Sequence, residues 1–307
     1  MRKENSNMMS VAILGSSGMI GSTVNLYLSK LNYRVIEVNR SGESTTGSNE
    51  TRRFDVLTDS IDELLKSLPK ETVVINLIGM IRHKIKADES DSKLVARRVN
   101  AEFPRDLVKA ADSLGLRVIQ IATDCIYSGK DGPYSESAKA DPVDVYGETK
   151  AAGELIAKNL LTLRVSIVGR EMKDHVELMD WVVNQRINSV IDGFRNHRWN
   201  GITSIHFAKI LDGILQEDFC RAGTYHVVPK GSVSKFELVK MISEFSGRQD
   251  LSINEINAET PINRTLISEY PQINEDLWTG AGYKHIPTIR IMVEEYFKWG
   301  NQIDQGE

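Results

Sequence analysis

Residues 10–21 read SVAILGSSGMIG and decide the expected fold. Ser10 to Leu14 reads as a buried strand, and residues 19–31 read as a helix because apolar side chains recur at helical spacing. Three glycines fall between them, where glycine alone leaves room for a pyrophosphate to approach the backbone. The start of the helix adds unpaired N–H groups and a favourable dipole. We therefore expect a dinucleotide-binding turn formed by Gly15, Ser17, Gly18, Met19, Ile20 and Gly21.

Arg40 follows the second expected strand, residues 34–38, and bears on the choice of cofactor. An NAD-binding site usually places an acidic side chain at the tip of this strand, for the ribose 2′-hydroxyl. Here the tip reads Val38-Asn39-Arg40-Ser41, without a carboxylate. The planar guanidinium of Arg40 suits a 2′-phosphate, so we expect NADP(H). Glu37, inside the strand, keeps NADH open.

Strands and helices alternate along the first half of the chain, which predicts an α/β fold with a doubly wound parallel sheet of the Rossmann type. Ligands of such sheets gather beyond the carboxyl ends of the strands. We expect strands at residues 11–14, 34–38, 73–77, 117–122 and 161–165, with a short one at 53–56, and helices at 60–67, 93–113 and 145–160.

Several side chains at the expected strand ends are candidates for cofactor contact. Asp55 and Val56 close the short strand, where an adenine ring would lie. Leu77, Ile78 and Gly79 follow the next strand, beside the expected path of the dinucleotide. Asn100 lies within a long helix, and an asparagine there has a propensity cost that asks for a reason.

The pattern is less regular beyond Val168. Helices are expected at residues 176–188, 205–216, 235–245 and 288–299, and short strands at 189–191, 224–228 and 251–256. We expect residues 1–168 to form the NADP(H)-binding domain and residues 169–307 to form mainly a smaller substrate-binding lobe, with a segment near 200–230 returning to the main sheet.

Tyr146 and Lys150 form the most informative pair in the chain. Side chains at i and i+4 of a helix share one face, so a lysine ammonium can lie beneath the tyrosine hydroxyl. Free phenol has a pKa of about 10, and a neighbouring positive charge favours the phenolate. With Thr123 at the end of the fifth strand, the pair predicts a proton donor beside a nicotinamide.

Composition limits the class of protein. The chain has 307 residues, 41% of them hydrophobic, and a formal charge of −4, which gives no reason to expect nucleic acid or membrane as a partner. Its six histidines are scattered, so no metal site is expected. Residues 1–7 are polar and lack the apolar core of a signal peptide. Cys125 and Cys220 are therefore expected to be reduced thiols in a cytoplasmic protein.

Together these motifs resemble the extended short-chain dehydrogenase/reductases, and most closely the dTDP-4-dehydrorhamnose reductase family. The most specific stretch is DPVDVYGETKAAGE at residues 141–154, supported by the glycine spacing and by Asn100-Ala101, Thr123-Asp124, residues 163–166 and residues 223–227. The resemblance implies that Thr123 binds the substrate carbonyl, Tyr146 donates the proton, and Lys150 holds the nicotinamide ribose. It further implies NADPH-dependent reduction of the C4 ketone of a nucleotide-linked 6-deoxy-4-hexulose, for deoxysugar and surface polysaccharide synthesis.

The chain departs from the family pattern in three places. Ala122 replaces the usual serine before Thr123, and Leu77-Ile78-Gly79 replaces a run of small residues. Near the carboxyl end, Asn263-Arg264-Thr265-Leu266 replaces the usual substrate motif. Arg264 is still a candidate diphosphate contact and Trp199 a candidate substrate contact, while the carrier (dTDP, UDP or GDP), a homodimer and magnesium dependence stay open.

Two alternative functions are kept open. Residues 123–127 also resemble the stretch of GDP-L-fucose synthases whose cysteine, with a later histidine, moves protons during epimerisation. Cys125 and His175 would then act on a carbon made acidic by the adjacent ketone. The second alternative is a regulatory subunit that binds NADP without turnover, because a fold does not fix a function.

Overall fold

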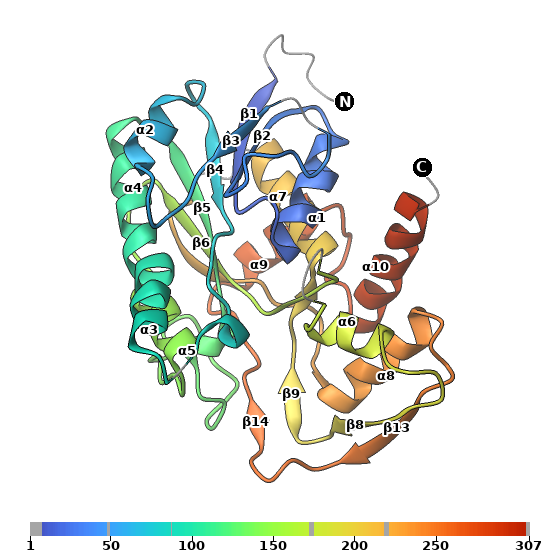
Figure 1. Ribbon diagram of the computed structural model, residues 1–307. Helices are drawn as coiled ribbons and strands as arrows, with labels where there is room; N and C mark the ends of the chain where they lie inside the picture. The colour runs from blue at the N-terminus through green and yellow to red at the C-terminus, as the bar shows by residue number, and fades with distance from the viewer. Residues whose placement is uncertain (1–7, 48–49, 87, 172–174, 218–220, 305–307) are drawn as a thin grey trace. The chain divides into compact units, whose positions relative to one another are not determined.

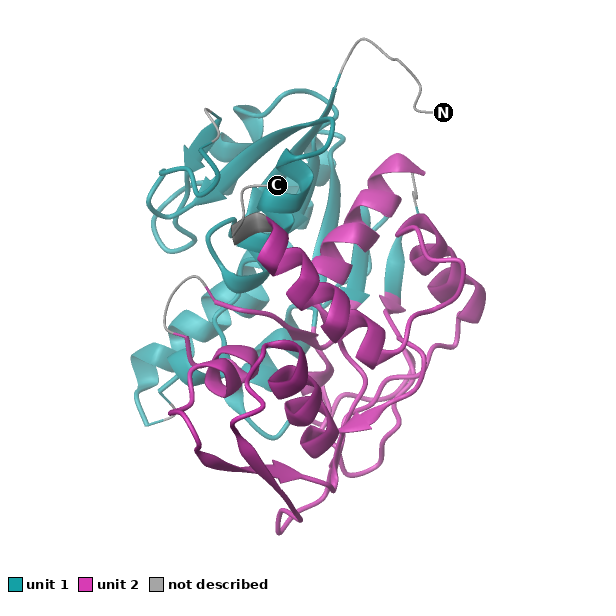
Figure 2. Cartoon of the chain, turned by 90° about the vertical axis from the view of Figure 1, so that its right-hand side faces the viewer, with its two compact units in different colours: residues 1–122, 142–163, 220–224 teal, residues 123–141, 164–219, 225–307 magenta. Residues whose placement is uncertain are grey.

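The computed structural model describes residues 8–47, 50–86, 88–171, 175–217 and 221–304, and its strands and helices alternate along the first half of the chain (Figure 1). Residues 1–7 and Cys220 lie outside the described residues. The chain divides into two compact units (Figure 2). Unit 1 comprises residues 1–122, 142–163 and 220–224, and unit 2 comprises residues 123–141, 164–219 and 225–307.

The largest sheet of the described residues has seven strands in the order β11-β6-β5-β4-β1-β2-β3. From β1 outward, β2 and then β3 pair in parallel on one side, and β4 and then β5 on the other. The strands are β1 (Met9–Leu14), β2 (Tyr33–Asn39), β3 (Thr51–Arg53), β4 (Val73–Asn76), β5 (Arg117–Ala122), β6 (Leu160–Arg164) and β11 (Gly223–His226). The order runs outward in both directions from β1, which confirms the predicted doubly wound sheet.

The apolar core of unit 1 explains why these strands form. Side chains alternate between the two faces of a strand, and Ala12, Leu14, Ile36 and Val38 belong to one buried cluster. Phe103 and other residues of the flanking helices complete it. Burial of each large aliphatic side chain contributes about 1.5–3 kcal/mol. The flanking helices of unit 1 are α1 (Met19–Ser29), α2 (Ile61–Lys66), α3 (Ser90–Arg97), α4 (Phe103–Ser113) and α5 (Val145–Ala152).

Three expected helices differ from those observed, and one of them, expected at residues 176–188, is only the six-residue helix α6 (Leu178–Val183). The helix expected at residues 93–113 contains a π-helical turn, Arg98–Glu102, between α3 and α4. The helix expected at residues 145–160 is wrong beyond Ala152, because α5 ends at Gly153. A Cβ atom built at Gly153 would lie 1.9 Å from the carbonyl oxygen of Asn100. The end of α5 therefore packs directly on the backbone of the π turn. No local sequence pattern predicts this contact.

Unit 2 holds most elements that the sequence did not predict. One of them is the helix that begins at Pro271, which occupies the first helical position that proline favours. In unit 1, the strand expected at residues 53–56 lies earlier, as β3. Three small sheets pair β8 (Val190–Phe194) with β13 (Ser252–Ile256), β7 (Ile167–Val168) with β10 (Ile202–Thr203), and β9 (His197–Trp199) with both β12 (Val233–Ser234) and β14 (Ile262–Asn263). The helices are α6 (Leu178–Val183), α7 (Ser204–Gln216), α8 (Lys235–Phe245), α9 (Pro271–Gly280) and α10 (Ile289–Asp304). Among the helices of the described residues, none combines the length and apolar character needed to cross a bilayer.

Candidate active site

The glycine-rich turn packs closely on neighbouring backbone. Gly15 has a φ of +84°, which side-chain-bearing residues rarely adopt, and its N–H donates to the carbonyl of Val38 at 2.9 Å. A Cβ atom built at Gly21 would lie 2.0 Å from the carbonyl oxygen of Gly15. Gly18 is exposed at the start of α1, while Ser17, Met19 and Ile20 are half-buried. The turn therefore leaves backbone accessible at the amino end of α1.

The end of β4 lies against this turn. A Cβ atom built at Gly15 would lie 3.1 Å from the backbone of both Leu77 and Ile78. Leu77 and Ile78 are half-buried, and Gly79 is exposed. The structure thus brings together two groups of residues that the sequence named separately.

Glu37 has a structural partner at every carboxylate oxygen. The side chain is fully buried, one oxygen accepts from the hydroxyls of Ser44 and Thr46, and the other accepts from the N–H and hydroxyl of Thr45 at 2.8 Å. Burial alone would raise the pKa of Glu37, but these hydrogen bonds lower it to about 2. Glu37 holds the loop after β2 in place, whereas Arg40 in that loop is exposed.

Asp55 and Val56 form the turn that follows β3. The carboxylate of Asp55 accepts from the backbone N–H of Leu57 at 2.9 Å. The backbone N–H of Asp55 donates to the carboxylate of Asp59 at 2.8 Å. Asp55 is half-buried and Val56 is buried. This carboxylate therefore already shapes a local turn.

Helix α5 carries the Tyr146/Lys150 pair. Asp144 caps the helix by accepting from the N–H of Gly147 at 2.8 Å, so Tyr146 and Lys150 lie one turn apart. The ammonium of Lys150 is buried and donates to the carbonyl of Ile121 in β5 at 3.2 Å. Burial lowers the pKa of Lys150 to about 8, against the opposing effect of Glu154. A lysine of this kind can change its charge near neutral pH.

The side-chain hydrogen bonds of Asn100 account for an asparagine within this helix. In the π turn, its amide oxygen accepts from the N–H of Met80 at 2.8 Å. Its amide nitrogen donates to the carbonyl of Met80 at 2.9 Å and to the hydroxyl of Thr149 at 3.1 Å. Asn100 thus ties the loop after β4 to α5, and thereby positions the helix of the pair.

Thr123 follows β5 and is the first residue of unit 2. Its buried hydroxyl accepts from the N–H of Cys125 at 3.2 Å and lies 3.3 Å from a carboxylate oxygen of Asp124. Asp124 is buried, and burial raises its pKa against the lowering effect of Arg264 and Lys235. The turn after β5 therefore combines a hydroxyl, a thiol and a carboxyl group.

Trp199 and Arg264 lie in the same unit as this turn. The indole N–H of Trp199 donates to the hydroxyl of Ser166 at 2.9 Å. Arg264 donates through Nε to the carbonyl of Tyr127 at 2.8 Å. Lys235, which sequence reasoning missed, lies with its Nζ 5.2 Å from the centroid of the Trp199 ring. The sequence places Lys235 at the start of an expected helix, but no local pattern marks its ammonium as part of a site.

His175 has a different environment. It is exposed, has a φ of +51°, and its Nδ1 lies 3.4 Å from the buried carboxylate of Asp180. Arg170 donates to the same carboxylate oxygen at 3.2 Å. The thiol of Cys125 lies 3.7 Å from Asp124. Epimerisation by Cys125 and His175 stays a prediction.

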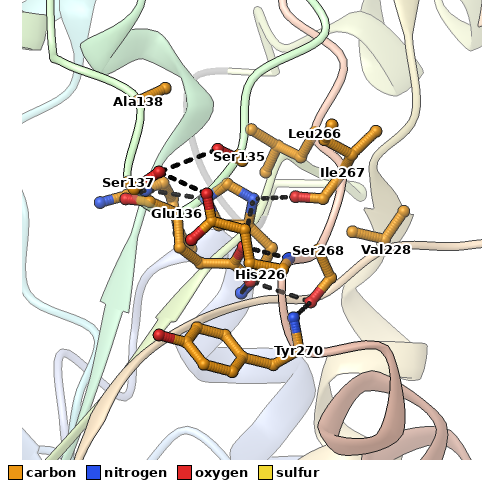
Figure 3. Close-up of polar contacts among 12 residues, drawn as sticks. Ser135, Glu136, Ser137, Ala138, His226, Val228, Leu266, Ile267, Ser268 and Tyr270 are labelled. Carbon is orange, nitrogen blue, oxygen red and sulfur yellow. Dashed lines mark hydrogen bonds and ion pairs between the residues drawn. The ribbon is translucent and has the colours of Figure 1, made fainter.

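A buried polar cluster around His226 supports unit 2 (Figure 3). His226 Nδ1 contacts the carbonyl of Ile267 at 2.8 Å, and Nε2 contacts the guanidinium of Arg164 at 2.7 Å. Since Arg164 can only donate, Nε2 accepts and the proton lies on Nδ1. The same guanidinium donates to the hydroxyl of Tyr127 at 2.9 Å. The carboxylate of Glu136 accepts from the backbone N–H of His226 at 2.9 Å. The cluster thus connects to Tyr127, whose carbonyl holds Arg264.

His226 is expected to make the protein less stable in acid. Burial lowers its pKa to about 4, with Glu136 opposing and Arg164 assisting. At a pH below about 6.5, the ordinary pKa of histidine, the unfolded chain binds a proton at His226 that the folded chain does not. The free energy of unfolding therefore decreases as the pH is lowered, by at most about 3 kcal/mol. Urea unfolding between pH 7 and 4 measures it. His226→Gln, which keeps one donor and one acceptor, should lose less stability over this range, and equal losses would contradict the assignment.

The doubly wound sheet and the Tyr146/Lys150 pair on α5 are those of an extended short-chain dehydrogenase/reductase, and the chain is a member of this class. Residues 9–299 then match the family described as RmlD substrate binding domain, and the chain belongs to this family. It is therefore an oxidoreductase.

Relatives and solved structures agree with the family. A dTDP-4-keto-6-deoxy-D-glucose reductase of Streptomyces niveus is 22% identical over 278 residues, which cover 88% of this chain and 90% of the relative. A dTDP-4-dehydrorhamnose reductase of Mycolicibacterium smegmatis is 26% identical over 247 residues, covering 77% and 69%. The crystal structure of a Bacillus anthracis dTDP-4-dehydrorhamnose reductase in complex with NADP superposes with a TM-score of 0.74 at 18% identity, covering 96% and 100%.

Proposed function

We propose that this protein reduces the C4 ketone of a nucleotide-linked 6-deoxy-4-hexulose with NADPH. The observation that carries the proposal is the buried ammonium of Lys150, one helical turn after Tyr146 on the capped helix α5. The names of the relatives supply the substrate class, because they reduce dTDP-linked 4-keto sugars. The product would be the corresponding nucleotide-linked 6-deoxyhexose.

Each protein group has one task in the proposed reaction. NADPH, when bound, supplies the hydride that adds to C4. The Thr123 hydroxyl, which donates to Asp124 in this structure, would turn its proton to the ketone oxygen, and Tyr146 transfers its phenolic proton to that oxygen. Lys150 stabilises the phenolate that remains, until the proton is replaced from solvent. One hydride and one proton thus convert the ketone to an alcohol and leave NADP⁺.

Several features favour NADPH as the reductant. The glycine-rich turn, with exposed Gly18 at the start of α1, suits a pyrophosphate at that end of the helix. Glu37 is occupied by hydroxyls and a backbone N–H of its own loop, and a ribose 2′-hydroxyl would have to displace them. Exposed Arg40 offers a cation for the 2′-phosphate. We place Leu77, Ile78 and Gly79 along the dinucleotide and Asp55 and Val56 near its adenine.

The remaining parts of the proposal concern the substrate and the cell. Arg264 and Trp199 would contact the nucleotide sugar, and residues 169–307 would supply most of the substrate-binding surface. We further infer a cytoplasmic enzyme of deoxysugar synthesis for a surface polysaccharide. A homodimer is the assembly to test, by light scattering.

A direct assay tests this function. Purified protein is mixed with NADPH or NADH and with dTDP-, UDP- or GDP-linked 4-keto-6-deoxyhexoses, and oxidation is followed at the nicotinamide absorbance. We expect turnover with at least one of these sugars and faster turnover with NADPH. Equal rates with NADH would overturn the role of Arg40, and no oxidation with any of the sugars would overturn the proposed substrate class.

A further inference from the structure

Lys235 occupies a position that the helix itself disfavours. It is the first residue of α8, and Ser234 and Glu237 form a capping box around that end of the helix. The amino end of a helix carries partial positive charge, so a lysine there is repelled. Neither the capping box nor the core needs a cation at this position, which suggests that the ammonium serves a ligand.

The surroundings hold the Lys235 ammonium in one place. Trp199 in β9 is paired with Val233 in β12, so the strand that leads into α8 lies beside the indole. Lys235 Nζ lies 5.2 Å from the centre of the indole ring, which attracts a cation through its face. The hydrogen bond from the indole N–H to Ser166 fixes the ring in turn. The fixed indole ring of Trp199 therefore helps to hold the ammonium of Lys235 in position.

The ammonium also lacks a close acceptor. Among the described residues, Lys235 makes no hydrogen bond and no ion pair within 4.0 Å. Burial lowers the pKa of Lys235, the charges of Asp124, Cys125 and Glu177 oppose this, and Arg264 adds to it by repulsion. Two cations that repel each other, with three ammonium donors unused, match a ligand that brings negatively charged oxygens.

We propose that Lys235, with Arg264, binds an anionic oxygen group of the nucleotide-sugar substrate, which is either its diphosphate or a carboxylate on its sugar ring. The inference rests on the proposed function, since it assumes a nucleotide sugar in unit 2. Lys235 lies near the turn after β5, because the charges of Asp124 and Cys125 act on it. Charge-assisted hydrogen bonds contribute about 1.5–3 kcal/mol, so loss of the ammonium should weaken binding roughly 10- to 100-fold.

Binding measurements by calorimetry test this role with stable probes. The probes are dTDP and UDP, each alone, as the glucose conjugate and as the glucuronate conjugate, with NADP⁺ present throughout. If Lys235 binds the diphosphate, Lys235→Met weakens all three forms of a nucleotide by a similar factor. If it binds a sugar carboxylate, only the glucuronate conjugate weakens. Lys235→Arg should retain most of the affinity in either case.

The control variant is Lys240→Met, because Lys240 lies on the same helix and is exposed. It should bind all probes as the unchanged protein does, and thermal unfolding should show that both methionine variants are folded. Affinities that differ by less than about twofold between Lys235→Met and the unchanged protein would overturn the role of Lys235. If the unchanged protein binds none of the probes, the proposed function fails first, which is a distinguishable result.

Discussion

Replacement of Tyr146 by phenylalanine is expected to lower the rate of ketone reduction by about 100- to 10,000-fold, the usual contribution of a positioned proton donor. The variant loses one oxygen and keeps the ring, which is half-buried on a capped helix. Helix α5 should therefore stay folded, with Lys150 still bonded to the carbonyl of Ile121. The change removes the proton and leaves the architecture that presents the cofactor.

Single-turnover kinetics with NADPH and the ketosugar measures this effect directly. The affinity for NADPH, measured by fluorescence titration, should change by less than about threefold, which corresponds to less than 1 kcal/mol, because the variant keeps the aromatic ring and helix α5. Tyr33→Phe, at the start of β2, is the matched control and should reduce the ketone at the normal rate. Full activity of Tyr146→Phe would show that another group donates the proton.

The dinucleotide turn could be predicted from the sequence because its determinants are local. The strand, the glycines and the helix are contiguous, the positive φ of Gly15 belongs to the turn itself, and the steric demand at Gly21 comes from Gly15 and Ser16. The Tyr146/Lys150 spacing is equally local, since helical periodicity alone places both side chains on one face. For such features, sequence and structure carry nearly the same information.

Other parts of the site could not be predicted because they depend on contacts between distant segments. Gly153, the residue after α5, has no room for a side chain because the carbonyl of Asn100 lies there. Glu37 looked available for a ribose, and its engagement by Ser44, Thr45 and Thr46 depends on how the following loop folds back. A sequence pattern lists donors and acceptors, whereas only the folded chain shows which are already satisfied.

Lys235 and His226 illustrate the same limit in unit 2. Each is an ordinary residue in sequence, and each gains its chemistry from elements far along the chain. Burial and the charge of Arg164 keep His226 neutral, against the opposing effects of Glu136 and of the carbonyl of Ile267. Tertiary packing sets the pKa of such groups through burial and neighbouring charge, neither of which appears in a motif.

Lys150→Met is expected to lower the rate of ketone reduction by about 100-fold or more, as loss of a charge aimed at the developing phenolate does elsewhere. Burial lowers the pKa of Lys150 to about 8, so the side chain is charged below that pH and neutral above it. The rate of reduction by the unchanged protein should therefore fall as the pH rises through about 8. The methionine variant should lack this ionisation, because it has no charge to lose.

The pH dependence of kcat/KM between pH 6 and 10, measured for the unchanged protein, Lys150→Met and Lys150→Arg, separates this role from a structural one. Arginine stays protonated throughout this range, so Lys150→Arg should keep part of the activity and lose the decline near pH 8. Methionine removes a buried ammonium and its desolvation cost, so Lys150→Met should unfold at the same temperature or higher. A decline near pH 8 that persists in Lys150→Met would assign that ionisation to another group and leave Lys150 with a positioning role alone.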